Sequence, residues 1–264
     1  AGEPLGEPAI YGTDRVFVYV GYAGQADAAN TAKLQQLEQA GHPVITILMN
    51  DALDLGAEFF RWEVATAVAS AVFGINPFDQ PNVQAAKTAT DGLMRVVETQ
   101  GSLPETTNPL AHENGVDYYV PVGSATEVLK AFFAQTKPGD FLSLQAYLTE
   151  SPAVSASLLE LRQRVQQQLH IATTSGYGPR FLHSTGQYHK GGPDTGLFVQ
   201  FTDDNPQDLA LPGRSYTFGT FKNAQALGDL EALQSYHRRT LRVHLGSNVE
   251  RGLKTLLAAL PELG

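Results

Sequence analysis

The stretch between residues 176 and 192 concentrates side chains that bind anions or transfer protons. It reads GYGPRFLHSTGQYHKGG and holds two histidines, an arginine, a lysine and five glycines. Histidine changes charge near neutral pH, and a glycine-rich backbone can turn its amides toward an anion. We therefore expect a binding or catalytic loop here. Its candidate residues are Arg180, His183, Ser184, Thr185, Gln187, His189 and Lys190.

A second stretch, residues 75–87 (INPFDQPNVQAAK), combines a loop with the start of a helix. Asp79 or Gln80 can cap the helix, and Pro81 suits its first turn because proline lacks the N–H that has no partner there. Lys87 then falls in the second turn, so a cation is held at a fixed junction. Such an ammonium can act as a general acid or as a fixed positive charge. The alternative is an ordinary solvent-facing lysine.

Two further features have both a functional and a structural interpretation. Glu63 lies on an apolar helix, where it is either a general base or half of a buried ion pair. His183 and His189 have no evident third ligand, so a metal site is not expected. Thr173, Thr174 and Ser175 carry hydroxyl groups that could bind a phosphate, or they simply follow the end of a helix.

An alternation of apolar and amphipathic segments predicts an α/β fold with a mainly parallel sheet. Residues 15–22 and 43–50 are expected strands around a helix at 29–40, and the second strand is apolar enough to be buried on both faces. The apolar helix at 56–73 should lie deep in the fold or at a subunit contact. Further helices are expected at 81–100, 124–135, 151–170, 218–236 and 249–260, and strands at 116–122, 141–149, 196–202 and 240–245.

Composition excludes several classes of function. The net charge of −9, with only 18 lysines and arginines, argues against a nucleic-acid partner. No run of eighteen apolar residues is present, so no membrane association is expected, and the absence of cysteine removes thiol chemistry. The turn between Gly21 and Gly24 lacks the glycine triplet of a dinucleotide fingerprint, which disfavours an oxidoreductase. A cytoplasmic location is the default expectation.

Both motifs resemble blocks of glucose-6-phosphate isomerases. Residues 75–87 are similar to the family's Asn-Pro-Phe-Asp-Gln-Pro-like loop, whose essential lysine corresponds to Lys87, although Asn82, Val83 and Gln84 replace the usual Gly-Val-Glu. Residues 176–192, and 224–233 after them, resemble the isomerase portion of bifunctional transaldolase/glucose-6-phosphate isomerases. The resemblance covers most of the chain.

The resemblance implies the C-terminal sugar-isomerase (SIS-type) domain of an enzyme of glycolysis and gluconeogenesis that interconverts glucose 6-phosphate and fructose 6-phosphate through ring opening and an enediol. It implies no cofactor and no metal. The implied partners are the sugar phosphate, a preceding isomerase domain and a second copy of the chain, and the isolated chain should be inactive. A noncatalytic sugar-phosphate-binding or assembly domain is the alternative. The implied catalytic residues are Lys87, His183, His189 and Glu63, and the implied substrate-binding residues are Gln80, Arg180, Ser184, Thr185, Gln187 and Lys190.

The expected organisation is a three-layer α/β/α fold with a further α/β portion on its C-terminal side. Glycine, proline, asparagine and threonine dominate residues 101–115, which therefore mark the expected boundary. A linker at 1–14 would precede an SIS-like half at 15–110 and a C-terminal portion at 111–264, packed as one unit. Ser124 and Glu127 match a capping box, which predicts a helix start.

Overall fold

The computed structural model describes residues 5–25, 27–104, 111–113, 115–119 and 124–263, which form two compact units, Ala1–Gln80 and Pro81–Gly264. The division falls after Gln80, before the helix at 81–100, because that helix packs on two later helices of the chain. The predicted boundary after residue 110 lies in a loop that is described only in part, and it stays a prediction.

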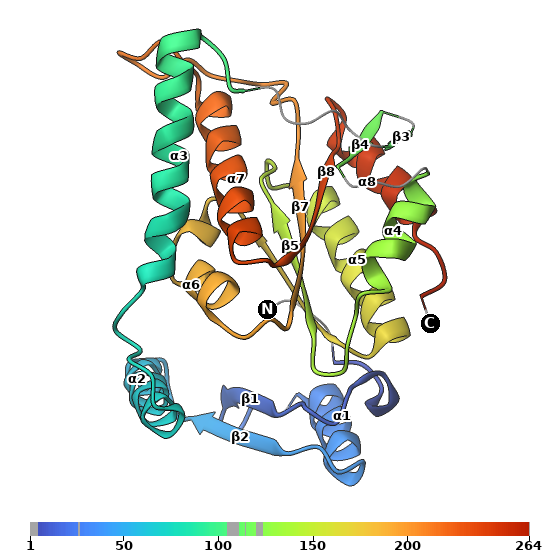
Figure 1. Ribbon diagram of the computed structural model, residues 1–264. Helices are drawn as coiled ribbons and strands as arrows, with labels where there is room; N and C mark the ends of the chain where they lie inside the picture. Colours follow the sequence, from blue (N-terminus) through green and yellow to red (C-terminus); the bar gives the residue numbers. More distant parts are fainter. Residues whose placement is uncertain (1–4, 26, 105–110, 114, 120–123, 264) are drawn as a thin grey trace. The chain divides into compact units, whose positions relative to one another are not determined.

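The first unit is a parallel β-α-β unit followed by a long helix. Strands β1 (Phe17–Tyr22) and β2 (Val44–Met49) pair directly and in parallel, and α1 (Ala28–Gln39) connects them in the sequence. This arrangement confirms the sequence prediction. A short 3-10 helix (Pro8–Ile10) precedes them and α2 (Asp54–Phe73) follows (Figure 1). Asp27 starts α1 by accepting a hydrogen bond from the backbone N–H of Asn30.

Much of the apolar surface of the first unit is exposed. The prediction that β2 is buried on both faces is wrong, because Ile45 and Leu48 are 50% and 56% exposed in a sheet of only two strands. Helix α2 likewise exposes Phe59, Phe60 and Phe73. The exposure of α2 does not agree with a position deep within this unit, and the alternative, a subunit contact, stays a prediction.

The second unit is built on one six-stranded sheet with the order β3-β4-β8-β7-β5-β6. The four strands β8, β7, β5 and β6 are parallel, whereas β3 and β4 add an antiparallel edge. The strands are β3 (Ala111–Glu113), β4 (Val116–Tyr118), β5 (Phe141–Ala146), β6 (Ala172–Tyr177), β7 (Gly196–Thr202) and β8 (Arg239–His244).

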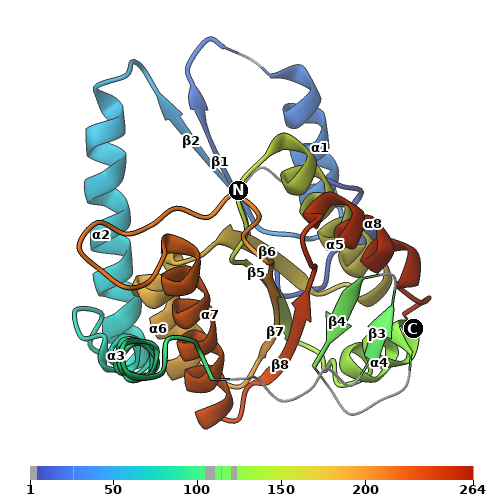
Figure 2. The same cartoon turned by 90° about the horizontal axis from the view of Figure 1, so that it is seen from above.

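Helices cover both faces of this sheet and produce the predicted three-layer α/β/α arrangement. One face carries α4 (Ala125–Phe133), α5 (Pro152–Leu169) and α8 (Val249–Ala259), and the other carries α3 (Pro81–Gln100), α6 (Ser184–Gly191) and α7 (Phe218–Ser235) (Figures 1 and 2). The main core lies under α4, α5 and α8, where Leu142, Leu197 and Leu241 of three neighbouring strands are fully buried. The opposite face is more polar.

Local sequence signals account for most helix starts in this unit. Ser124 and Glu127 form the predicted capping box of α4, while Ser151, Thr217 and Asn248 cap α5, α7 and α8 with their side-chain oxygens. Among the strands, β3 lies in the predicted loop, β6 was not predicted, and the described part of the expected strand at 116–122 ends at Tyr118. Residues 120–123 of that strand lie outside the described residues.

Helices α3 and α7 pack closely through a glycine, and this contact yields a stability prediction. A Cβ at Gly228 would lie 2.6 Å from Thr90 Oγ1 and 2.7 Å from the Thr90 backbone nitrogen. Gly228→Ala should therefore lower the free energy of unfolding by about 1 to 3 kcal/mol in urea denaturation followed by circular dichroism.

Gly92 on α3 is the matched control, because a Cβ there would have no neighbour within 4 Å. Gly92→Ala should stabilise the protein by about 0.5 to 1 kcal/mol through helix propensity. Equal effects of the two substitutions would contradict the close helix packing.

Candidate functional site

The two motif segments meet where α6 lies against the first turn of α3. Gln187 Oε1 accepts a hydrogen bond from the backbone N–H of Asn82 at 2.9 Å, and Gln187 Nε2 donates to Asn82 Oδ1 at 2.6 Å. The Asn82 N–H is one of the donors that a helix start leaves without a partner inside the helix. This reciprocal pair joins segments that lie 105 residues apart in the sequence.

The expected loop at 176–192 is instead ordered secondary structure. It contains the end of β6, a 3-10 helix (Arg180–Leu182) and α6. Gly186 permits the sharp passage between the two helices, since a Cβ there would lie 1.8 Å from the Phe181 carbonyl oxygen. The glycines of this stretch thus allow close packing, since an added Cβ would meet a backbone oxygen at Gly186 and Gly192 and a neighbouring side chain at Gly178 and Gly191.

Several predicted site residues surround the start of α6 at the protein surface. His183 is the N-terminal flanking residue of α6, and Arg180, Ser184 and Thr185 beside it are exposed as well. Lys87 is also exposed, on α3. Lys87 follows Asn82 by five positions in the helix, which corresponds to about 140° around the axis. Lys87 therefore lies on a different side of α3 from the contact with Gln187.

Lys190 does not face solvent, because it forms a buried ion pair between α6 and α7. Its Nζ donates to Asp229 Oδ1 at 2.5 Å and to the Phe181 carbonyl at 3.3 Å, and neither charged side chain is exposed. Burial raises the pKa of Asp229, while the Lys190 ammonium acts in the opposite direction. Burial, reinforced by Asp229, raises the pKa of the neighbouring Tyr147. The expectation that Lys190 binds substrate directly is therefore not met in this structure.

His189 is buried as well, between two aromatic rings. Its imidazole stacks on Phe181 with a centroid distance of 6.0 Å and meets the edge of Phe198 at 5.0 Å. Burial, and then the charge of Lys190, lower the pKa of His189 to about 4. Gln145 Nε2 donates to His189 Nδ1 at 3.2 Å, as a neutral ring allows. His189 is thus a neutral core residue, and of the two histidines only His183 can meet a ligand at the surface.

The remaining predicted residues lie elsewhere. Glu63 and Gln80 belong to the first unit and are exposed, while the neighbouring Glu58 pairs with Arg61 at 3.2 Å. Thr173, Thr174 and Ser175 are strand residues of β6 and form no loop. The Arg162 guanidinium donates to the Thr173 carbonyl at 2.9 Å and to the hydroxyls of Thr173 and Ser175, which gives this stretch a structural role.

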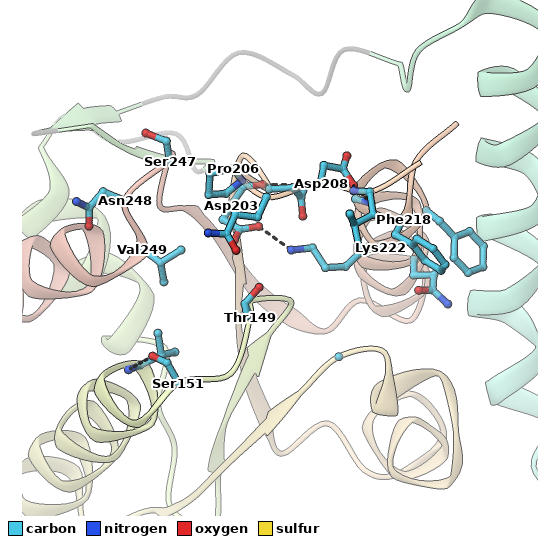
Figure 3. A pocket seen from close by; sticks show the side chains of 18 of the residues that line it. Thr149, Ser151, Asp203, Pro206, Asp208, Phe218, Lys222, Ser247, Asn248 and Val249 are labelled. Atoms are coloured by element: carbon cyan, nitrogen blue, oxygen red, sulfur yellow. Dashed lines mark hydrogen bonds and ion pairs between the residues drawn. The ribbon is translucent and has the colours of Figure 1, made fainter. Parts of the chain in front are cut away.

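A cleft of about 700 Å³ opens at the carboxyl ends of the parallel strands of the second unit. It was not predicted from the sequence. Figure 3 shows Lys222 at its centre, donating to Asp203 at 2.6 Å, with the Thr149 hydroxyl below this pair. Helices α5, α7 and α8 begin at its edge, and Gly178 and Pro179 connect it to the motif at 176–192.

The loop after β7 that forms one wall of the cleft is held from several sides. Asp204 accepts a hydrogen bond from His244 Nε2 at 2.8 Å, and Asp208 accepts from the backbone N–H groups of Leu209 and Gly219. Burial acts to raise the pKa of Asp208, but hydrogen bonds from Thr217, Gly219 and Leu209 lower this pKa below its ordinary value. The sequence feature that could have indicated this loop as part of a site is the polar run at residues 203–205, which directly follows a buried strand.

No group of three or more histidine, aspartate or glutamate side chains in the described part of the chain is placed to hold a metal ion. None of the helices seen there combines the length and the apolar character needed to cross a membrane.

The second unit is therefore a three-layer α/β domain with a cleft at the carboxyl edge of its sheet, and short stretches of the chain match glucose-6-phosphate isomerases. The isomerase of Rubrobacter xylanophilus is 44% identical over 65 residues, 24% of this chain and 15% of that protein. The isomerase of Limosilactobacillus fermentum is 45% identical over 56 residues, 20% of this chain and 12% of that protein. The matches thus span less than a sixth of either relative.

Comparison at the level of families and of solved structures adds little. No protein-family model matches the chain. A hypothetical protein from Thermus thermophilus superposes with a TM-score of 0.42 and 13% identity, covering 97% of this chain and 68% of that protein.

The buried ion pair can be tested by removing one or both charges. Lys190→Met leaves the Asp229 carboxylate buried without its cation, so the free energy of unfolding should fall by about 3 to 5 kcal/mol. Lys190→Met/Asp229→Asn removes both charges with little change in volume and should recover part of this loss in urea titrations. A double variant less stable than Lys190→Met would show that the charges do not compensate each other.

Buried His189 predicts a pH dependence of stability. Its folded pKa of about 4 lies below the ordinary value near 6.5, so the folded state binds the proton less readily than the unfolded state. The stabilisation is complete above pH 6.5 and is lost as the pH falls toward 4, by about 3 kcal/mol in all. Urea denaturation across this range should show a shallower slope for His189→Gln than for wild type, whereas His183→Gln should follow wild type. Equal slopes for all three proteins would contradict the assignment.

Proposed function

We propose that the chain is part of an aldose-ketose isomerase that interconverts glucose 6-phosphate and fructose 6-phosphate. The observation that carries this proposal is the pair of local matches to glucose-6-phosphate isomerases, at 44% and 45% identity. Exposed Lys87 and His183, on helices joined by the Asn82–Gln187 pair, support it. The whole enzyme's activity extends well beyond the matched stretches and is part of the proposal.

The proposed chemistry needs a proton for the ring oxygen, a base between C1 and C2, and cations for the phosphate and the enediolate. Lys87 supplies the cation or proton donor, and His183 assists ring opening. Glu63 is the proposed base, and Gln80, Arg180, Ser184 and Thr185 are proposed to bind the substrate. Buried His189 and Lys190 hold α6 in place and do not touch the sugar.

We propose that the site is completed by an isomerase domain that precedes this chain in the same protein. The exposed aromatic residues of α2 support such a contact, since Phe59, Phe60 and Phe73 are 64%, 68% and 74% exposed. The proposal includes a cytoplasmic, homo-oligomeric enzyme, fused to a transaldolase as in the bifunctional proteins that it resembles.

A noncatalytic assembly domain is the second candidate function. The same aromatic surface of α2 favours it, because a protein whose only task is to bind another domain needs an apolar contact and no turnover. The two candidates differ in whether an exposed polar residue of the chain affects the rate of the isomerase.

Lys87→Met in the isomerase that contains this chain tests the proposed function. Methionine keeps the aliphatic stem and the helix preference but deletes the cation. We expect kcat/KM for glucose 6-phosphate to fall by about 10² to 10⁴, because a positioned acid or charge is lost. Thermal stability should stay close to that of wild type.

Lys254→Met is the matched control, since Lys254 is an exposed helical lysine on α8, across the sheet from α3. It should leave kcat/KM unchanged. An open-chain substrate should restore part of the activity of Lys87→Met if Lys87 serves ring opening, and little if it stabilises the enediolate. A folded Lys87→Met enzyme with normal kcat/KM would favour the assembly function.

A further inference from the structure

We propose that the cleft at the carboxyl edge of the second unit binds an uncharged polyhydroxyl ligand such as a free sugar. The cleft lies within one unit and contains none of the exposed residues proposed for isomerisation. This inference therefore does not depend on the proposed isomerase function.

The position of the cleft follows from the topology of the sheet. Strands β5 and β7 are neighbours, yet α5 follows β5 on one face and α7 follows β7 on the other (Figures 1 and 2). The two connections therefore diverge and leave a crevice between them, which is where open α/β sheets bind ligands. Its volume of about 700 Å³ lies in the usual range for small-molecule sites.

The walls of the crevice are fixed before any ligand arrives. Lys222 of α7 holds Asp203 at 2.6 Å, and His244 of β8 holds the next residue, Asp204, at 2.8 Å. The Asp203 side chain is only 3% exposed although its partner borders the open cleft. A ligand would therefore meet a preorganised surface and would cause little loss of conformational freedom in the protein.

The charges around the cleft nearly cancel. Asp203, Asp208 and Glu250 against Lys222 leave two net negative charges among the lining residues. Three helices begin there, and each helix start contributes about half a positive elementary charge. The sum is close to zero, so neither a strongly anionic nor a strongly cationic ligand is favoured.

Phosphate is further disfavoured because a side chain already accepts a hydrogen bond from a backbone amide at the start of each of the three helices. Ser151 accepts from Val154 N–H, Asn248 from Arg251 N–H, and Asp208 from Gly219 N–H at 2.7 Å. An anion site at a helix start needs such N–H groups free. Capped helix starts instead offer side-chain hydroxyl and amide groups.

The lining that remains suits hydroxyl groups on a partly apolar framework. Thr149 directs its hydroxyl toward the Asp203–Lys222 pair, and Ser151, Ser247 and Asn248 lie along one side (Figure 3). Hydroxyls and amides both donate and accept hydrogen bonds, as sugar hydroxyls do. The apolar part of the wall comprises Val154, Leu209, Phe218, Phe221 and Val249, which can cover the C–H face of a sugar ring.

The test uses the full 264-residue chain with D-glucose, D-ribose, myo-inositol, glucose 6-phosphate and adenosine as probes. We expect saturable calorimetric binding of at least one neutral polyol, tighter than glucose 6-phosphate and insensitive to salt. Amide chemical shifts should change at Thr149, Gly219 and Ser247, around the cleft. Thr149→Val, which removes one hydroxyl from an exposed position, should weaken binding about three- to tenfold.

Thr174→Val is the matched control, because it makes the same change on the adjacent strand β6, outside the cleft lining. It should bind the polyol as wild type does. Three results would overturn the proposal: no saturable binding of any polyol, tighter and salt-sensitive binding of glucose 6-phosphate at the cleft, or preference for adenosine. Equal binding by Thr149→Val and wild type would place the ligand elsewhere.

Discussion

The buried ion pair between Lys190 and Asp229 is the interaction on which the arrangement of the second unit depends. It fastens α6 to α7 in a region where neither charge reaches water. Isolated charges there would carry a large desolvation cost, so each helix requires the other in place. Arg238 strengthens the junction by donating to the carbonyls of Lys190 and Gly192 at 2.6 Å. The surface around His183 lies at the start of α6 and the cleft wall formed by Lys222 lies on α7, so this pair joins the two helices that carry them.

The two faces of the sheet serve different purposes. The face under α4, α5 and α8 is an apolar core, whereas the face under α3, α6 and α7 contains hydrogen-bonded polar groups such as Gln145 and Gln200. A hydrogen-bonded polar layer favours one helix arrangement over others, because any shift leaves buried donors or acceptors without partners. A single helix arrangement also holds the exposed side chains of α3 and α6 at fixed positions relative to each other.

The first unit presents the opposite situation. The two-stranded parallel sheet has exposed apolar residues on both faces, and the aromatic helix is exposed as well. Parallel strands normally have both faces covered, so this unit buries unusually little of its apolar surface. The stretches similar to glucose-6-phosphate isomerases cover only 15% and 12% of the lengths of those proteins. Exposed Glu63 and Gln80 belong to this unit.

Local signals in the sequence determined the elements, and tertiary packing decided the roles of the polar residues. Pro81 began α3 and Ser124 with Glu127 began α4 as predicted, because caps and periodicity act within one or two turns. The sequence could not show that His189 and Lys190 are buried while His183, only six residues away, is exposed. Burial depends on Asp229, Phe198 and Gln145, which are distant in sequence. The cleft likewise required the strand order, because divergence after β5 and β7 arises only once they are neighbours.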